Sequence, residues 1–151
     1  MMDLQALYQE VILDHNRTPR NHHAMPCATC EARGVNPLCG DQLMVYVKLE
    51  AGVLQDVSFV GEGCAISQAS ASLMTEVLQG KTEIEARVLF EQFHVLLTQD
   101  DAVAGAELGK LAVFEGVRAF PARVKCATLA WHALDAALNK DAHNEAFVST
   151  E

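Results

Sequence analysis

Two runs of alternating side chains joined by a short turn constrain this fold more than any other feature of the sequence. Aliphatic residues occupy every second position from Leu43 to Leu49, and a similar run extends from Val53 through Val57 to Phe59. Alternate side chains of a β-strand point to opposite faces of a sheet, so this period is typical of strands. The Ala51-Gly52 pair between the runs is typical of a tight turn, and the segment is therefore predicted to form a hairpin.

Helical periodicity dominates the rest of the chain. Apolar residues at helical spacing predict helices over Leu4 to about His15, Ile66 to Val77, Thr82 to Leu97, Leu111 to Val117 and Pro121 to Leu138. The residues from Asn21 to Gly40 are predicted to be mostly loop, with a short edge strand near Ala32 to Val35, and Asp100 to Gly109 is predicted to be a polar connection. We therefore expect one α+β domain over residues 1–140 and a flexible C-terminal tail over residues 141–151.

The composition suits a compact core and argues against several classes of partner. Half of the 151 residues are hydrophobic and 21% are charged. The net charge is −9 and no Lys/Arg-rich run occurs, so we expect no nucleic acid and no membrane surface as a partner. The N-terminal segment lacks the pattern of a secretion signal, and no apolar run approaches the roughly 18 residues that span a bilayer. We expect a cytoplasmic protein whose cysteines lie in reducing surroundings.

The cysteines are the residues most suited to chemistry. Five cysteines are an odd number, and a disulfide framework is a poor explanation for them inside a cell, so metal binding or thiolate chemistry is the better interpretation. Cys39 and Asp41 lie in a turn-forming segment directly before the first hairpin strand, where a thiolate and a carboxylate can face one point. Cys64 lies where the second strand gives way to a helix, and a helix N-terminus favours the thiolate.

Cys126 completes a candidate set of metal ligands. It follows Arg123 and Lys125 near the start of the last predicted helix, so we expect these cations and the helix dipole to favour its thiolate. Together with Asp41, three thiolates would make a tetrahedral set suited to zinc or to one end of an iron–sulfur cluster. The carboxylate is the more labile ligand, so the mixed set indicates an exchangeable site.

Each of these residues also has a purely structural interpretation. Cys39 can be a small apolar side chain in an ordinary turn, and Cys64 can be packed beneath the hairpin. The Cys27-x-x-Cys30 pair is a competing zinc or redox motif, although no second pair of this spacing occurs. A structural zinc ribbon formed by Cys27, Cys30, Cys39 and Cys64 therefore stays open as an alternative.

Three segments carry a resemblance to a known family. Asn36 to Asp41 (NPLCGD), Gly61 to Glu76 (GEGCAISQASASLMTE) and Pro121 to Leu134 (PARVKCATLAWHAL) resemble the IscU/NifU-like iron–sulfur cluster assembly family, and specifically its SufU branch. The similarity extends from Leu7 to about Leu138. It implies a compact α+β fold in which a three-stranded antiparallel sheet packs against helices.

The resemblance also implies roles for individual residues. Cys39, Asp41, Cys64 and Cys126 would be the ligands of a zinc ion, and Cys39 would accept persulfide sulfur from a SufS-like, pyridoxal-phosphate-dependent cysteine desulfurase. Arg123 would act as a supporting cation in this transfer. A histidine of the desulfurase would take a zinc ligand position while Cys39 is released, and the sulfur would pass on to downstream iron–sulfur assembly proteins. No role is implied for Cys27 and Cys30.

The scaffold branch of the same family is the alternative interpretation, with an iron–sulfur cluster in place of zinc. That branch has a His directly before its third cysteine and a Leu-Pro-Pro-Val-Lys motif, whereas this chain has Lys125 before Cys126 and Phe120-Pro121-Ala122-Arg123 at the motif. The 61 residues between Cys64 and Cys126 also exceed what the scaffold branch needs, with the extra material around Thr98 to Phe114. These differences favour a zinc-dependent sulfurtransferase over a scaffold.

Overall fold

The computed structural model of the chain describes residues 4–99, 101–139 and 146–149. The helical elements are α1 (Leu4–Arg17), α2 (Ala65–Leu78), α3 (Glu83–Thr98), the 3-10 segment η1 (Ala106–Ala119) and α4 (Pro121–Asn139). The strands are β1 (Cys30–Asn36), β2 (Asp41–Glu50), β3 (Val53–Glu62) and β4 (Ala146–Ser149). The predicted α+β fold, the hairpin and the predicted helices are confirmed.

An antiparallel sheet of β1, β2 and β3 forms the framework of the fold. Asn36 pairs with Asp41 at one end of β1, and Cys30 pairs with Val47 at the other. The hairpin turn between β2 and β3 has positive φ angles at Ala51 (53°) and Gly52 (78°), the conformation whose twist matches that of the flanking strands. The register places Leu43, Val45 and Val47 on the buried face.

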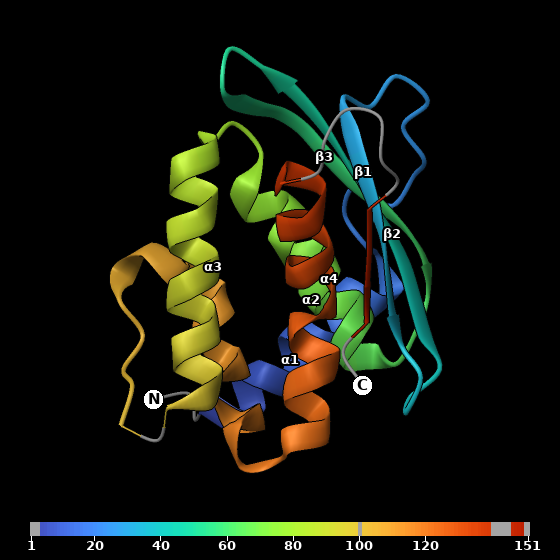
Figure 1. The fold of residues 1–151 in the computed structure, drawn as a ribbon. Coiled ribbons are helices and arrows are strands. Elements are labelled where there is room, and N and C mark those ends of the chain that lie inside the picture. The colour runs from blue at the N-terminus through green and yellow to red at the C-terminus, as the bar shows by residue number, and fades with distance from the viewer. Residues whose placement is uncertain (1–3, 100, 140–145, 150–151) are drawn as a thin grey trace.

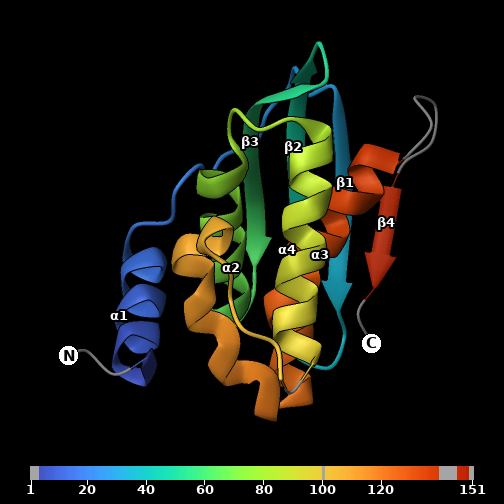
Figure 2. The same cartoon turned by 90° about the vertical axis from the view of Figure 1, so that its left-hand side faces the viewer.

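A short fourth strand lies where the sequence analysis predicted a tail. Within the described residues the strand order is β3-β2-β1-β4, and β4 runs parallel to β1, with Ala32 opposite Ala146 and Val35 opposite Ser149. Figure 2 shows β4 at the edge of the sheet beside β1. Four residues give little periodicity, so pairing with β1, not a local pattern, defines this strand. The rest of the predicted tail, residues 140–145 and 150–151, lies outside the described residues.

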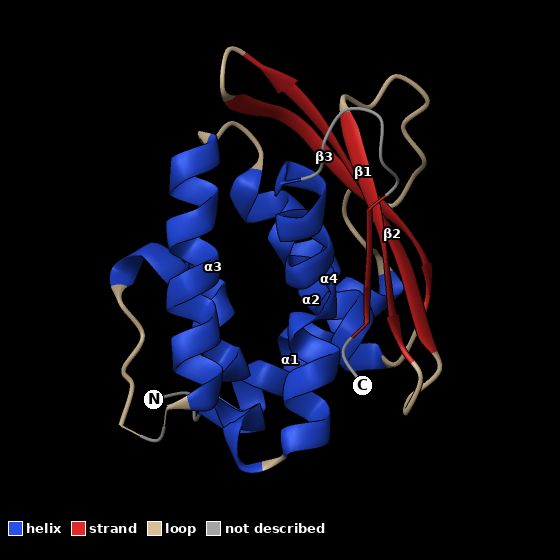
Figure 3. Cartoon of the chain, viewed as in Figure 1, coloured by secondary structure: helices blue, strands red, loops and turns tan. Residues whose placement is uncertain are grey.

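The helices cover one face of the sheet (Figures 1 and 3). Helix α4 packs on β1 and β2, α2 packs on β3 and on α4, and α3 and η1 pack against each other and against α4. Trp131 of α4 is fully buried at the centre of this arrangement, and its ring lies 5.1 Å from that of Phe93. In the part of the chain that the structure describes, no helix combines the length and apolar character needed to cross a bilayer.

Segment η1 begins earlier than the sequence predicted. Residues from Ala106 are already helical, whereas the sequence analysis assigned Asp100 to Gly109 to a polar connection. Gly109 has φ 52° and ψ −126° and divides the segment into two pieces. The first piece buries Leu108, so one apolar side chain anchors a stretch whose overall composition is polar.

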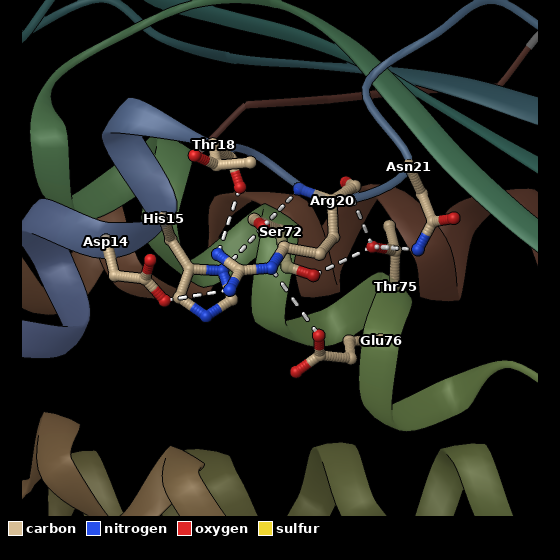
Figure 4. Close-up of polar contacts among 8 residues, drawn as sticks. All are labelled: Asp14, His15, Thr18, Arg20, Asn21, Ser72, Thr75 and Glu76. Carbon is tan, nitrogen blue, oxygen red and sulfur yellow. Dashed lines mark hydrogen bonds and ion pairs between the residues drawn. The ribbon is translucent and has the colours of Figure 1, made fainter.

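A polar network fastens α1 and the loop after it to α2 (Figure 4). The Ser72 hydroxyl lies 2.6 Å from Nδ1 of the buried His15 and accepts a hydrogen bond from the backbone N–H of Arg20 at 2.8 Å. The Arg20 guanidinium donates to Asp14 at 2.8 Å and lies 3.7 Å from Glu76. This network holds α1 against the helix whose first turn forms part of the candidate site.

Candidate metal centre

The ends of three elements bring the predicted ligands together. Cys39 lies in the turn between β1 and β2, Asp41 is the first residue of β2, and Cys126 is the sixth residue of α4. The ligand atoms of these three residues all lie within 4.8 Å of one another, and the Cys126 thiol donates to Cys39 Sγ at 3.3 Å. Residues far apart in sequence thus form one cluster of sulfur and oxygen donors.

Cys64 joins this cluster through Asp41. It is the N-cap of α2, and its Sγ accepts the backbone N–H of Ser67 at 3.4 Å, so its predicted position at a helix N-terminus is confirmed. Its own backbone N–H donates to Asp41 Oδ1 at 2.7 Å, and its thiol lies 3.9 Å from Asp41 Oδ2. The structure therefore places Cys64 beside the group of Cys39, Asp41 and Cys126, in contact with Asp41 and close enough to Cys126 to raise the pKa of its thiol.

Two glycines make room for this arrangement. A Cβ atom on Gly63 would lie 2.8 Å from Asp41 Oδ1 and 3.1 Å from Ser67 Oγ. Gly61 has φ 139°, and a Cβ there would collide with the backbone carbonyl of Gln42. Gly61 is therefore required by the close approach of β3 to β2, and Gly63 by the close approach of Asp41 on β2 to the start of α2, beyond the needs of a tight turn.

The turn that carries Cys39 presents its side chain to solvent. The carbonyl oxygen of Asn36 accepts the backbone N–H groups of Cys39 at 3.2 Å and Gly40 at 2.9 Å, and Gly40 has φ 73°. Cys39 is exposed, Cys64 is half-buried, and Cys126 and Asp41 are buried. An approaching reagent or partner therefore reaches the Cys39 sulfur before the other two.

The electrostatics of the site depend on burial more than on nearby cations. Burial raises the pKa of the Cys126 thiol, and the hydrogen bond with Cys39 and the negative charges of Cys64 and Asp41 raise it further. The expectation that Arg123, Lys125 and the helix dipole would favour the Cys126 thiolate is therefore wrong, because Cys126 is 3% exposed and burial has the largest effect on its pKa, whereas the Arg123 side chain is exposed and lies on the Phe120 ring.

This environment fits a bound cation. A buried thiolate beside two further sulfurs and a carboxylate needs a positive charge to offset desolvation and mutual repulsion. Three cysteines and one aspartate supply the number and types of ligand that tetrahedral zinc takes. The donor set of Cys39, Asp41, Cys64 and Cys126 thus fits the metal that the sequence analysis expected.

Two further side chains, Arg123 and Tyr8, contribute to the electrostatics around the site. The Arg123 guanidinium lies 4.5 Å from the centre of the Phe120 ring and is exposed. Burial raises the pKa of Tyr8 on α1, the positive charge of Arg123 lowers it, and the charges of Cys64 and Cys126 raise it. Tyr8 has the helical spacing of an apolar face, which gives no sign of this proximity to the site.

Cys27 and Cys30 do not belong to this cluster. Cys30 is the first residue of β1, whereas Asn36, at the other end of the strand, borders the Cys39 turn. Six residues of strand separate these ends by about 20 Å. The alternative of a structural zinc ribbon that combines Cys27 and Cys30 with Cys39 and Cys64 is therefore wrong.

Comparisons with known proteins agree on one family. The family described as the NifU-like N terminal domain matches residues 7–146. The zinc-dependent sulfurtransferase SufU of Bacillus subtilis is 38% identical over 92% of this chain and 94% of its own length. The iron–sulfur cluster assembly scaffold protein IscU of Streptococcus pyogenes is also 38% identical, over 93% of this chain and 87% of its own. The solved structure of FiSufU from Fervidobacterium islandicum matches with a TM-score of 0.82 and 33% identity, over 89% and 98% of the two chains.

Proposed function

The chain belongs to the NifU-like N-terminal domain family, and from that premise we propose that it is a zinc-dependent sulfurtransferase of iron–sulfur cluster assembly. Its task is to accept persulfide sulfur on Cys39. The observation that carries the proposal is the contrast in exposure within one cluster, where Cys39 is exposed while Asp41 and Cys126 are buried. Such a site can hold a metal with its inner ligands and present one sulfur outward.

The four proposed ligands have different roles in metal retention and sulfur transfer. Zinc, when bound, keeps its cysteine ligands deprotonated at neutral pH. Asp41 is fixed by the backbone N–H of Cys64, and the buried Cys126 is held within α4, so these residues retain the site. Cys39 stands in a turn and exposes its sulfur, so it is the ligand best placed to leave the site and react.

The transfer itself is a thiol–persulfide exchange. The Cys39 thiolate attacks the terminal sulfur of a cysteine persulfide on the donor protein, a new sulfur–sulfur bond forms, and the original one breaks. The donor cysteine leaves as a thiolate and Cys39 becomes a persulfide, so no external oxidant or reductant is consumed. The donor we propose is a cysteine desulfurase, which holds its own pyridoxal phosphate. The exposed guanidinium of Arg123 would offset negative charge during the exchange.

A cluster scaffold is the second candidate function. It is favoured by the equal identity to the S. pyogenes protein named IscU and by the carboxylate in the ligand set, which is exchanged more readily than a thiolate. Either function places the chain in iron–sulfur cluster assembly. We place it in the cytoplasm, where reducing conditions keep its cysteines available.

The two candidates are separated by an anaerobic assay. The purified protein is analysed for metal and mixed with a cysteine desulfurase and cysteine, with a Cys39→Ser variant as the control. Zinc in the protein and faster turnover of the desulfurase, lost in Cys39→Ser, support the sulfurtransferase. If the protein instead forms a stable cluster that moves intact to an acceptor protein, and does not stimulate the desulfurase, the result would support the scaffold function and contradict the sulfurtransferase.

A further inference from the structure

The three sulfurs of the site differ in the hydrogen bonds that they accept. Cys64 Sγ accepts the backbone N–H of Ser67 at 3.4 Å, and Cys126 Sγ accepts the side-chain amide of Asn36 at 3.5 Å. Among the described residues, no N–H group donates to Cys39 Sγ, whose hydrogen bond comes from the Cys126 thiol. In the part of the chain that the structure describes, two sulfurs therefore have N–H donors and the exposed one has none.

This difference matters once the sulfurs are thiolates. An N–H donor aimed at a metal-bound thiolate makes a charge-assisted hydrogen bond, which stabilises the negative charge and orients the ligand. A thiolate stabilised in this way is a weaker nucleophile and a more persistent ligand. The hydrogen-bond pattern therefore favours Cys64 and Cys126 as ligands that stay and Cys39 as the one that leaves.

Asn36 occupies an unusual position for such a donor. It is the last residue of β1, it is fully buried, and its carbonyl oxygen closes the turn that carries Cys39. Its side-chain Oδ1 is buried without a hydrogen-bond partner among the described residues. Burying an unpaired amide oxygen is costly, so apolar packing alone does not explain an Asn here. The amide contact with Cys126 is the interaction that this side chain supplies.

We propose that Asn36 is a positioning residue that keeps zinc on Cys126 while Cys39 is released to accept sulfur. This inference rests on the proposed function. Asn36 then acts on both cysteines. Its backbone carbonyl holds the turn that carries Cys39, the ligand that leaves, and its side-chain amide secures Cys126, the ligand that stays. Loss of the side-chain amide leaves the carbonyl and the turn in place but removes the donor to Cys126.

The test measures whether zinc survives the loss of Cys39 as a ligand. Zinc-loaded protein is treated with iodoacetamide until Cys39 is alkylated, and zinc released to a chromogenic chelator is measured against Cys39 modification by mass spectrometry. The exposed Cys27 is replaced by Ala in every sample so that it does not react. Asn36→Leu has a similar size and no donor. Ser58→Ala is the matched control, because it also removes a buried polar atom without a partner among the described residues. Ser58 lies about 13 Å along β3 from Glu62, the end of the strand that leads to Cys64, so this change is away from the site.

The expected result is that the parent protein and Ser58→Ala retain zinc after Cys39 is alkylated. Asn36→Leu is expected to lose it at a chelator concentration about 10- to 100-fold lower, the usual effect of removing a partner of a metal ligand. Equal retention by Asn36→Leu and Ser58→Ala would overturn the role of Asn36. A parent protein that binds no zinc would instead overturn the proposed function itself, so the two failures are distinguishable.

A second measurement needs no variant and covers the case in which Asn36→Leu does not fold. The parent protein is loaded with an NMR-active cadmium isotope in place of zinc, and coupling between the metal and amide protons is recorded. Such coupling passes through N–H···S hydrogen bonds, so we expect it at the Asn36 side chain and at the Ser67 backbone. Coupling at Ser67 without coupling at Asn36 would contradict the inference.

Discussion

The backbone N–H of Cys64 donates to Asp41 Oδ1 at 2.7 Å and joins the first turn of α2 to the first residue of β2. Asp41 is 1% exposed, so this bond fixes a buried carboxylate whose other oxygen faces the Cys64 thiol at 3.9 Å. The backbone thus sets the orientation of the proposed oxygen ligand independently of any metal. The candidate site is therefore part of the junction between β2 and α2.

Gly63→Ala is predicted to weaken zinc binding by about tenfold, the scale for disturbing an interaction around a metal ligand. The added Cβ would lie 2.8 Å from Asp41 Oδ1 and would push the carboxylate from its place beside Cys64. Zinc affinity measured by chelator competition checks this. Gly116→Ala is the control, because no atom lies within 4 Å of the Cβ that it would add. Equal affinities for the two variants would show that the position of Asp41 is not critical.

Removal of zinc is predicted to destabilise the fold. The proposed ligands come from the β1–β2 turn, β2, the start of α2 and α4, so a metal bound to them would link elements that the unfolded chain does not hold together. A metal at a free concentration a hundredfold above its Kd stabilises by about 2.7 kcal/mol through mass action. Thermal unfolding with and without chelator measures this difference. Chelator should change the thermal unfolding of a Cys126→Ser variant much less than that of the parent protein. An equal change would mean that zinc binds at another site.

Acidification is predicted to destabilise the protein through His15. Burial lowers the pKa of His15 below its ordinary value of 6.5, with a further contribution from Arg20. The Ser72 oxygen already accepts the N–H of Arg20, so its proton is available for Nδ1 of a neutral His15. Because the unfolded state binds the proton more readily, this stability is complete above pH 6.5 and is lost as pH falls towards the folded-state pKa.

Denaturant titrations on both sides of that pH measure the effect. His15→Gln removes the titrating group and should show a smaller decrease in unfolding free energy on acidification. His23→Gln, at an exposed histidine, is the control and should behave like the parent protein. An unchanged pH dependence in His15→Gln would mean that other groups dominate the acid response.

Arg123→Ala is predicted to slow sulfur acceptance about tenfold, because it removes a positive charge from an association of charged partners. Zinc content should stay at the parent level, since the Arg123 side chain lies over the Phe120 ring and, within the described residues, does not contact a proposed zinc ligand. Rates of desulfurase stimulation measured at low and high salt check the electrostatic origin. Arg87→Ala on α3 is the control. An equal loss of desulfurase stimulation in Arg87→Ala would show that Arg123 has no specific role.

Local patterns were sufficient to predict most of the framework. The alternation from Leu43 to Leu49 and the turn at Ala51-Gly52 identify the hairpin, because strand period and turn conformation are local properties. The strand Ala146–Ser149 was missed, since it is defined by its pairing with β1, a contact between segments far apart in the sequence. The early start of η1 was missed because Leu108 alone anchors it.

The candidate site was predictable only in part. The N-terminal position of Cys64 on a helix follows from local sequence, and the chemistry of the residues suggested the four candidate ligands that the resemblance to the family also implies. The raised pKa of Cys126 and the amide donor at Asn36 depend on burial between segments far apart in the chain. Spacing along the sequence carries no information about such tertiary contacts, so the charges of nearby residues gave the wrong sign for Cys126.

The central claim is that Cys39 is the sulfur acceptor of a zinc site. The most direct measurement incubates the zinc-loaded protein anaerobically with a cysteine desulfurase and cysteine, then locates added sulfur by mass spectrometry of its peptides. The account predicts one additional sulfur atom on Cys39, none on Cys64 or Cys126, and no added sulfur in Cys39→Ser. Sulfur on another cysteine, or an unmodified Cys39 in zinc-loaded protein beside an active desulfurase, would contradict it.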